Sequence, residues 1–201
     1  MKGIKSVIIL GLYLSGAAAI ASSADTGLFD EYNRSGKFEV YGLGEVLTGW
    51  QTTSSSGVNL KFDTGYGGGL GAAYNFNNHL ALNTDFSVGS LSLTGTGYGY
   101  SESASGATLR WYGSLDYNIL RRRLTPFVTA GGGLIGFYGT WSGAATFSET
   151  DPAWGVGGGL RWDISDHWYV KALYRANWTS LQGSSSTTLF HSITLGIGFS
   201  F

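Results

Sequence analysis

The sequence predicts an all-β protein: an eight-stranded antiparallel up-and-down transmembrane β-barrel, preceded by a cleavable signal peptide. Three observations predict this fold class. Eight segments alternate between apolar and polar residues, which is the period of a strand with two unlike faces. The connections between these segments alternate between long and short, as in a chain of hairpins. After residue 24, no segment keeps a helical period.

The first 24 residues have the composition of a secretory signal peptide. MKGIK supplies two lysines, SVIILGLYL is apolar, and SGAAAIASSA is rich in small residues. The apolar stretch is shorter than the roughly 20 residues that a membrane-spanning helix needs, which argues against a retained anchor. We expect cleavage after Ala24, with Ala21 as the alternative site.

The composition excludes several classes of protein. The chain has no cysteine, so disulfides, thiolate metal sites and cysteine nucleophiles are impossible. Its formal net charge is −1, which argues against nucleic acid as a partner. Only 12% of the residues are charged, about half the share expected of a soluble domain. The 33 glycines and the 15% of aromatic residues fit an exported all-β protein that avoids surface charge.

The alternation can be followed strand by strand. In residues 80–88, for example, Leu82 and Phe86 alternate with Asn83 and Asp85. In the segment from 125 to 139 the phase is ambiguous past Leu134. The predicted strands are residues 37–50, 60–76, 80–88, 107–118, 125–139, 154–164, 168–178 and 192–201.

The connections predict a meander of four hairpins. Residues 77–79, 121–123 and 165–167 form short turns. Residues 52–59, 91–105, 140–151 and 179–187 form longer loops, rich in Ser, Thr and Gly. We expect this meander to close, because closure removes the exposed edges of an open sheet.

A closed barrel of this kind can point its apolar rows inward, as in a soluble lipocalin, or outward into lipid. Three features favour lipid. The polar rows contain glycines that suit a crowded interior, such as Gly67 and Gly69, and no ionised residue interrupts an apolar row at mid-strand. The apolar rows also carry their aromatics near the strand ends, at the levels of the two bilayer interfaces. Near the short turns these are Tyr74, Phe76, Tyr117, Trp162, Trp168, Phe199 and Phe201, and near the long loops Trp50, Phe62, Trp154 and Trp178.

The inward rows then carry a nearly balanced set of charges. Such charges must be paired inside a barrel, because an unpaired buried charge is very costly. An eight-stranded barrel has room for side chains and little else, which favours a polar plug over a narrow ion path. The predicted lumen residues are Glu39, Glu45, Lys61, Asp63, Asp85, Arg110, Asp116, Arg161, Asp163, Lys171 and Arg175.

The chain resembles a known family in four segments: FEVYGLGEV, YGGGLGAAYNFNNHLAL, TPFVTAGGGL and TLGIGFSF. These are similar to the small eight-stranded outer-membrane β-barrels, comprising OmpX-like, opacity-protein-like and OmpA-transmembrane-domain-like proteins. The resemblance covers nearly all of the chain after residue 24 and implies an architecture rather than an activity. It also implies that Leu195, Ile197, Phe199 and Phe201 resemble the signal read by the barrel-assembly machinery.

Catalysis is not expected. Some eight-stranded barrels deacylate lipid A with a Ser–His–acid arrangement, but His191 and Ser192 are neighbours on a strand and point to opposite faces. His79 and His167 lie in short turns. Three scattered histidines make a poor metal site, so we expect no metal and no cofactor.

The long loops offer the candidates for recognition. Tyr98 and Tyr100 lie among Gly and Ser, and Trp141 and Phe147 lie in TWSGAATF. Aromatics among small polar residues suit adaptable binding, and equally suit an upper aromatic girdle.

These observations together predict residues 1–24 as the signal peptide, 25–36 as a short periplasmic segment and 37–201 as the barrel. We expect a monomer in the outer membrane of a Gram-negative-type bacterium, in contact with its lipid and lipopolysaccharide. The expected role is structural or adhesin-like, with a possible extracellular ligand at four loops. The alternatives are a narrow pore for ions or small solutes and, less favoured, a lipid A-modifying enzyme.

Overall fold

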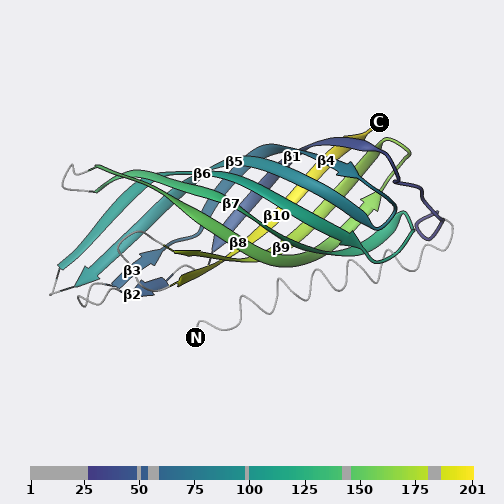
Figure 1. Ribbon diagram of the computed structural model, residues 1–201. Coiled ribbons are helices and arrows are strands. Elements are labelled where there is room, and N and C mark those ends of the chain that lie inside the picture. Colours follow the sequence, from purple (N-terminus) through teal and green to yellow (C-terminus); the bar gives the residue numbers. More distant parts are fainter. Residues whose placement is uncertain (1–26, 49–50, 54–58, 98–99, 142–145, 181–186) are drawn as a thin grey trace.

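A computed structural model describes residues 27–48, 51–53, 59–97, 100–141, 146–180 and 187–201 (Figure 1). Within these ranges, no helix is long and apolar enough to cross a membrane. The strands are β1 (Phe38–Thr48), β2 (Gln51–Thr53), β3 (Asn59–Phe62), β4 (Gly65–Asn75), β5 (Leu80–Gly97), β6 (Tyr100–Asn118), β7 (Leu124–Trp141), β8 (Thr146–Asp163), β9 (Trp168–Ser180) and β10 (Thr187–Ser200).

These ten segments form a closed antiparallel barrel of eight strands. β1 pairs with β4 and β2 pairs with β3, so β1 and β2 make up the first barrel strand and β3 and β4 the second. β5 to β10 are the remaining six, each paired with its neighbours in chain order. The predicted fold class, an eight-stranded up-and-down barrel, is confirmed.

The barrel closes between its first and last strands. β1 runs antiparallel to β10 from Glu39 opposite Ser200 to Thr48 opposite His191. Phe38 and Phe201 extend this seam, since the amide nitrogen of each donates to the carbonyl oxygen of the other at 2.9 Å. Figure 1 shows the start of β1 and the C-terminus at the same end of the barrel, the end of the short turns.

The two faces of each strand differ as the alternation predicts. In β5, Asn83 and Asp85 are buried, whereas Leu82 and Phe86 are each 47% exposed. The apolar rows therefore face outward around the barrel and the polar rows face inward. In β7 the alternation continues past Leu134, with Ile135 and Phe137 buried on the inner face. Because an outward apolar surface needs a nonaqueous neighbour, this orientation fits a bilayer.

Inward glycines make room for inward aromatic rings. A Cβ atom added at Gly71 would overlap the ring of Tyr41, and one added at Gly198 would overlap the ring of Tyr169. The rings of these tyrosines therefore occupy space that side chains on the facing strands would otherwise fill. Glycine by itself weakens a strand. In these polar rows that cost is offset, because the missing side chain leaves room for a tyrosine ring.

The strands extend further than the sequence predicted. Residues 91–97 and 100–105 belong to β5 and β6, and residues 140–141 and 146–151 belong to β7 and β8. The prediction of long loops at 91–105 and 140–151 is wrong for these residues. Beyond Leu91 and Leu93 they lack apolar alternation, yet they pair regularly, with Gly97 opposite Tyr100 and Thr140 opposite Thr146. A hairpin that rises beyond the lipid has no lipid-facing side, so its sequence need not alternate.

Residues 60–76 were predicted as one strand, and the structure divides them. β3 ends at Phe62 and β4 begins at Gly65. β3 pairs with both β2 and β5, which keeps the second barrel strand within the sheet. The predicted signal peptide, residues 1–24, lies outside the described residues.

Residues 27–37 fold across the short-turn end of the barrel. Gly36 has a positive φ of 76°, which reverses the chain just before β1. The amide of Tyr32 donates to the carbonyl of Arg121 at 3.0 Å, and the amide of Leu124 donates to the carbonyl of Leu28 at 3.0 Å. Leu28 and Tyr32 are buried in consequence. Residues 27–37 therefore pack against the barrel and cover this end of its interior.

Candidate functional site in the barrel interior

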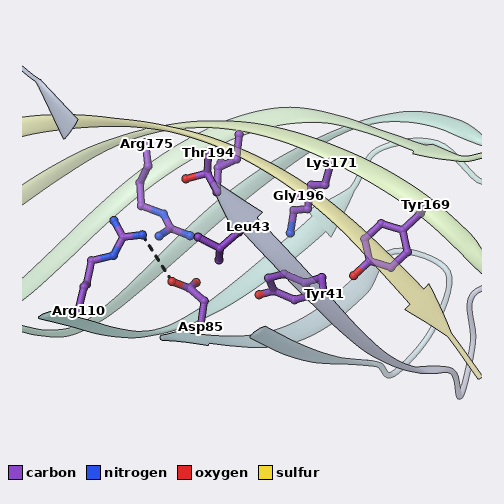
Figure 2. Close-up of a pocket in the computed structure, with 10 residues that line it drawn as sticks. Tyr41, Leu43, Asp85, Arg110, Tyr169, Lys171, Arg175, Thr194 and Gly196 are labelled. Carbon is purple, nitrogen blue, oxygen red and sulfur yellow. Dashed lines mark ion pairs between the residues drawn. The ribbon is translucent and has the colours of Figure 1, made fainter. Parts of the chain in front are cut away.

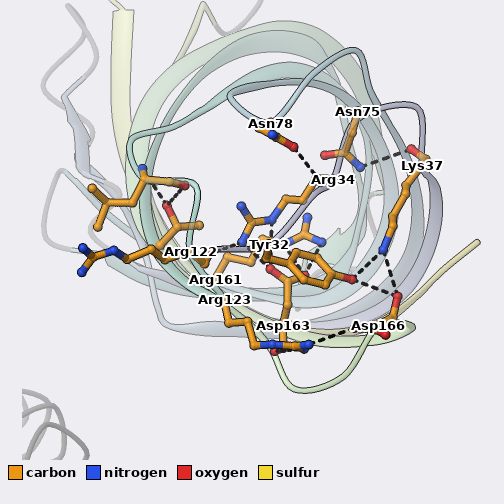
Figure 3. A network of polar contacts seen from close by, with 12 residues as sticks. Tyr32, Arg34, Lys37, Asn75, Asn78, Arg122, Arg123, Arg161, Asp163 and Asp166 are labelled. Carbon is orange, nitrogen blue, oxygen red and sulfur yellow. Dashed lines mark hydrogen bonds and ion pairs between the residues drawn. The ribbon is translucent and has the colours of Figure 1, made fainter. Parts of the chain in front are cut away.

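The most extensive polar network lies at the short-turn end of the interior (Figure 3). Arg161 donates from Nη1 to Glu39 Oε2 at 2.9 Å and from Nη2 to Glu39 Oε1 at 2.7 Å. It also donates to Asp163 Oδ1, from Nε at 3.1 Å and from Nη2 at 2.8 Å. Asn75 Nδ2 adds a bond to Glu39 Oε1 at 2.6 Å. One guanidinium thus joins two buried carboxylates from β1 and β8.

Arg34 completes this network from outside the barrel strands. Its Nε donates to Asp163 Oδ2 at 2.9 Å, and its Nη2 donates to the carbonyl of Arg122 at 2.6 Å. The side chain is fully buried. Burial lowers the pKa of Arg34 below its ordinary value, and the Asp163 carboxylate opposes that shift. The bonds of Arg34 to Asp163 and to the carbonyl of Arg122 therefore hold residues 27–37 against the end of the barrel.

A second ion pair lies further into the interior. Lys171 of β9 pairs with Asp116 of β6 across the barrel, and its Nζ also contacts Asn83 Oδ1 at 3.5 Å. The Nζ atom lies 4.6 Å from the centroid of the Phe127 ring, a cation–π contact. In the sheet, β6 and β9 are separated by β7 and β8, so this pair crosses the interior between strands that are not neighbours.

A third cluster surrounds Arg110 of β6. Arg110 pairs with Glu45 of β1 and lies 3.6 Å from Asp85 of β5. Ser87 Oγ donates to Glu45 Oε1 at 2.6 Å. All four side chains are buried. The cluster holds β1, β5 and β6 in one register, because a slip by one residue would turn its charges to the outer face.

Arg175 differs from the other interior cations. It is buried, and no carboxylate of the described residues lies within ion-pairing distance of it. Its guanidinium lies 4.2 Å from the centroid of the Tyr112 ring, and the Tyr112 hydroxyl donates to the carbonyl of Gly131 at 2.9 Å. Cation–π contact with a buried ring compensates part of the cost of burying this charge.

A small cavity lies between these clusters (Figure 2). Its volume is about 30 Å³, which is room for about two water molecules. Figure 2 shows Arg110 and Arg175 on one side of it, and Tyr41 and Tyr169 on the other. This cavity between the clusters therefore has space for isolated water and none for a solute.

The structure brings most of the predicted lumen residues together. Nine of the eleven point inward: eight enter the three clusters, and Arg175 lies beside them. Glu39, Arg161 and Asp163 form the network at the short-turn end, Asp116 and Lys171 the middle pair, and Glu45, Asp85 and Arg110 the third cluster.

Lys61 and Asp63 do not belong to this interior, so their prediction as lumen residues is wrong. They form a distant pair, 3.9 Å apart, with side chains 70% and 47% exposed. Lys61 lies in β3, which pairs with β2 and with the far part of β5. This part of the sheet lies beyond the filled interior, so inward-row side chains meet solvent there.

Sequence reasoning missed three kinds of interior residue. Arg34 was assigned to a short periplasmic segment, and no pattern in 25–36 distinguishes it. Tyr41, Tyr112 and Tyr169 fill the interior, and their place in the inward rows beside Glu39, Arg110 and Lys171 was a usable signal. Asp151, buried at the far end of β8, was placed in a loop.

The remaining candidates lie elsewhere. Tyr100, Trp141 and Phe147 lie in β6, β7 and β8 rather than in irregular loops, and their side chains are outside the described part of the structure, as is all of Tyr98. Leu195, Ile197 and Phe201 face outward and are exposed, and Phe199 is half-buried on the same face.

His191 and Ser192 point to opposite faces. Ser192 is buried inside the barrel, and the Nδ1 atom of His191 lies 2.8 Å from the hydroxyl of Tyr174 on the outer face. These two side chains therefore cannot act as a nucleophile and its base on one wall.

An eight-stranded barrel with apolar rows outside and paired charges inside can be compared with known proteins. The family described as outer membrane protein beta-barrel domain matches residues 10–201. The chain belongs to this family. Its localisation is therefore the outer membrane, and the short turns of such barrels face the periplasm. A comparison with curated protein sequences gives no significant match.

Solved structures of outer-membrane proteins share the fold. OprG of Pseudomonas aeruginosa has a TM-score of 0.60 at 13% identity, covering 85% of this chain and 98% of that one. Neisserial surface protein A has a TM-score of 0.57 at 15% identity, covering 83% and 100%. Ail, the attachment invasion locus protein of Yersinia pestis, has a TM-score of 0.52 at 15% identity, covering 83% and 99%. Identities this low show a common fold and nothing finer.

Proposed function

We propose that this outer-membrane barrel is a closed scaffold that displays long hairpins at the cell surface, in a structural or adhesin-like role. The observation that carries the proposal is the filled interior. Three clusters of ion pairs cross it, and the cavity between them holds only about two waters. A barrel closed in this way would act through its outer surfaces, and the filled interior supports that role over a pore.

The hairpins at the long-loop end support this role. β5 and β6 pair up to Gly97 and Tyr100, and β7 and β8 pair up to Thr140 and Thr146. Figure 1 shows both hairpins reaching well past β2 and β3. Regular pairing makes them stiff, so little ordering entropy is lost when they bind a partner. The name of Ail, an attachment invasion locus protein with the same fold, agrees with such a role.

Attachment of cells that display the barrel to a cultured epithelial monolayer tests the adhesin-like role. One variant shortens the β5–β6 hairpin by joining Ser92 to Ser105, which are cross-strand partners, through an Asn-Gly turn. A matched variant joins Gly139 to Phe147 in β7–β8 in the same way. We expect the full chain to raise attachment several-fold and at least one shortened variant to lose this gain. Equal attachment by cells with and without the barrel would refute the adhesin-like role.

Conductance in planar bilayers tests the closed interior. A flat current trace is expected, and steady unitary currents would support the narrow pore instead.

Lipid A mass spectra from expressing and deletion strains test the enzyme alternative. We expect identical spectra, because His191 and Ser192 lie on opposite faces of β10.

A further inference from the structure

A pocket at the periplasmic end lies outside the network that closes the interior. It is an open hollow of about 570 Å³ between the β4–β5 turn and the β6–β7 turn. Its lining residues are Ser35, Asn77, Asn78, His79, Leu80, Tyr117 and Arg121. None of them is acidic.

His79 fixes the direction of Arg121. The Nδ1 atom of His79 lies 2.7 Å from the carbonyl oxygen of Asn118, so this nitrogen carries the proton that the carbonyl accepts. Nε2 is then the acceptor, and Arg121 Nε donates to it at 3.0 Å. The imidazole also stacks on the Tyr117 ring at 5.6 Å between centroids. The His79 ring is thus fixed by the Asn118 carbonyl and the Tyr117 ring, and it in turn fixes the side chain of Arg121.

The turn that carries His79 is fixed as well. Asn77 Oδ1 accepts the amide hydrogens of His79 at 2.8 Å and Leu80 at 2.9 Å. Asn78 Oδ1 accepts the amide hydrogen of Arg34 at 2.8 Å, a bond drawn in Figure 3. With Oδ1 used in this way, the NH₂ group of Asn78 is the part of its amide left to donate to a ligand. The pocket is therefore a preformed set of donors.

The charge of Arg121 has no counterion among the described residues. Its Nη groups make no hydrogen bond or ion pair there, whereas the neighbouring Arg123 pairs with Asp166 at 2.9 Å. A guanidinium with both Nη groups free presents the fork that binds phosphate in two parallel bonds. The ligand that suits this pocket is therefore an anion with several oxygens.

The position of the pocket identifies the source of that anion. Tyr117 and Leu80 are cross-strand partners at its edge, and Leu82 and Leu115 are the next outward pair into the bilayer. Tyr117, Leu82 and Leu115 are about half exposed. A molecule with its phosphate on Arg121 would therefore lay its acyl chains along these leucines. Basic pockets beside a bilayer bind lipid headgroups in this way.

We propose that this pocket, the His79–Arg121 pocket, binds the phosphate of an anionic phospholipid of the periplasmic leaflet. Arg121 supplies the charge, Asn78 a further donor, and His79 positions the guanidinium. The lipid would also fasten residues 27–37, since Ser35 lines the pocket and the amide of Tyr32 donates to the carbonyl of Arg121. This inference is independent of any role of the surface hairpins.

Native mass spectrometry of the full chain, extracted from membranes in a neutral detergent, tests the proposal with phosphatidylglycerol as the probe. Arg121→Gln should weaken retention of phosphatidylglycerol about tenfold, since one charge-assisted bidentate contact is lost. The matched control Arg122→Gln removes a neighbouring charge that does not line the pocket and should leave retention unchanged. His79→Phe keeps a ring on Tyr117 but loses the acceptor for Arg121, and should weaken retention several-fold.

Two further probes separate the sources of the anion. Diacylglycerol, which lacks the phosphate, should be retained poorly and equally by the wild-type chain and Arg121→Gln. Glycerol phosphate, which lacks the acyl chains, should compete only at far higher concentration than the lipid. Equal retention of phosphatidylglycerol by all variants, or a similar loss in Arg122→Gln, would overturn the proposal. Competition by glycerol phosphate at the concentration of the lipid would show a soluble-anion pocket instead. The heat-dependent gel shift of each variant reports whether the barrel has folded.

Discussion

Replacing Arg161 by Met removes the guanidinium that joins Glu39 to Asp163 at the periplasmic end of the barrel. Met keeps much of the aliphatic volume, so the change acts mainly on charge and hydrogen bonding. Four hydrogen bonds are lost, two to each carboxylate. Asp163 keeps its pair with Arg34, whereas Glu39 keeps hydrogen bonds only to the uncharged side chains of Asn75 and Tyr169. A buried carboxylate is then left without a cation.

The size of the effect follows from that arrangement. Removing one partner of a buried ion pair costs about 3–5 kcal/mol. The bond from Asn75 to Glu39, at 2.6 Å, lowers this penalty, so we expect a loss of about 3 kcal/mol in the free energy of unfolding. Such a loss lowers the folding equilibrium constant by more than about a hundredfold.

Urea unfolding of the barrel in lipid vesicles, followed by tryptophan fluorescence and by the heat-dependent gel shift, measures this loss. Adding Glu39→Met to Arg161→Met removes the stranded carboxylate, so the double variant should recover part of the stability. Lys61→Met is the control, because its pair with Asp63 is exposed and 3.9 Å long, and it should cost less than about 1 kcal/mol. The reasoning fails if Arg161→Met costs no more than Lys61→Met, or if Glu39→Met lowers its stability further.

Three other predictions use the same unfolding and gel-shift measurements. Gly71→Val should destabilise the barrel by about 1–3 kcal/mol because its side chain would overlap Tyr41, whereas Gly42→Ala, with no neighbour within 4 Å, should be tolerated; equal effects would contradict the packing. Leu195→Arg, on the exposed outer face, should cost about 2–4 kcal/mol in vesicles, and a neutral result would place this row away from lipid. Deleting Phe201 removes two backbone bonds of the closing seam and should reduce folded barrel in the outer membrane several-fold, while an unchanged yield would show that neither assembly nor closure depends on it.

Sequence and structure agree best where the information is local. The alternation in residues 80–88 assigned Leu82 and Asp85 to opposite faces, and the structure bears this out. Residues 91–105 were misassigned, because a polar hairpin above the bilayer has the same composition as an irregular loop. Lys61 was misplaced for a related reason. The sequence assigned Lys61 to the inward face of its strand. Its position along the barrel axis depends on which part of β5 pairs with β3, and this is the part beyond the filled interior.

The sequence by itself determined the strands, their two faces and therefore the membrane as the environment of this protein. These are properties of neighbouring residues, since a strand presents alternate side chains to opposite sides wherever it lies. Only the tertiary structure decided which charges meet. Arg161 and Glu39 are 122 residues apart and Arg34 and Asp163 are 129 apart, and they become neighbours through the stagger of eight strands and the return of residues 27–37 across the opening. The same geometry set His79 beside Arg121, because two turns that are separate in sequence become adjacent when β5 and β6 pair.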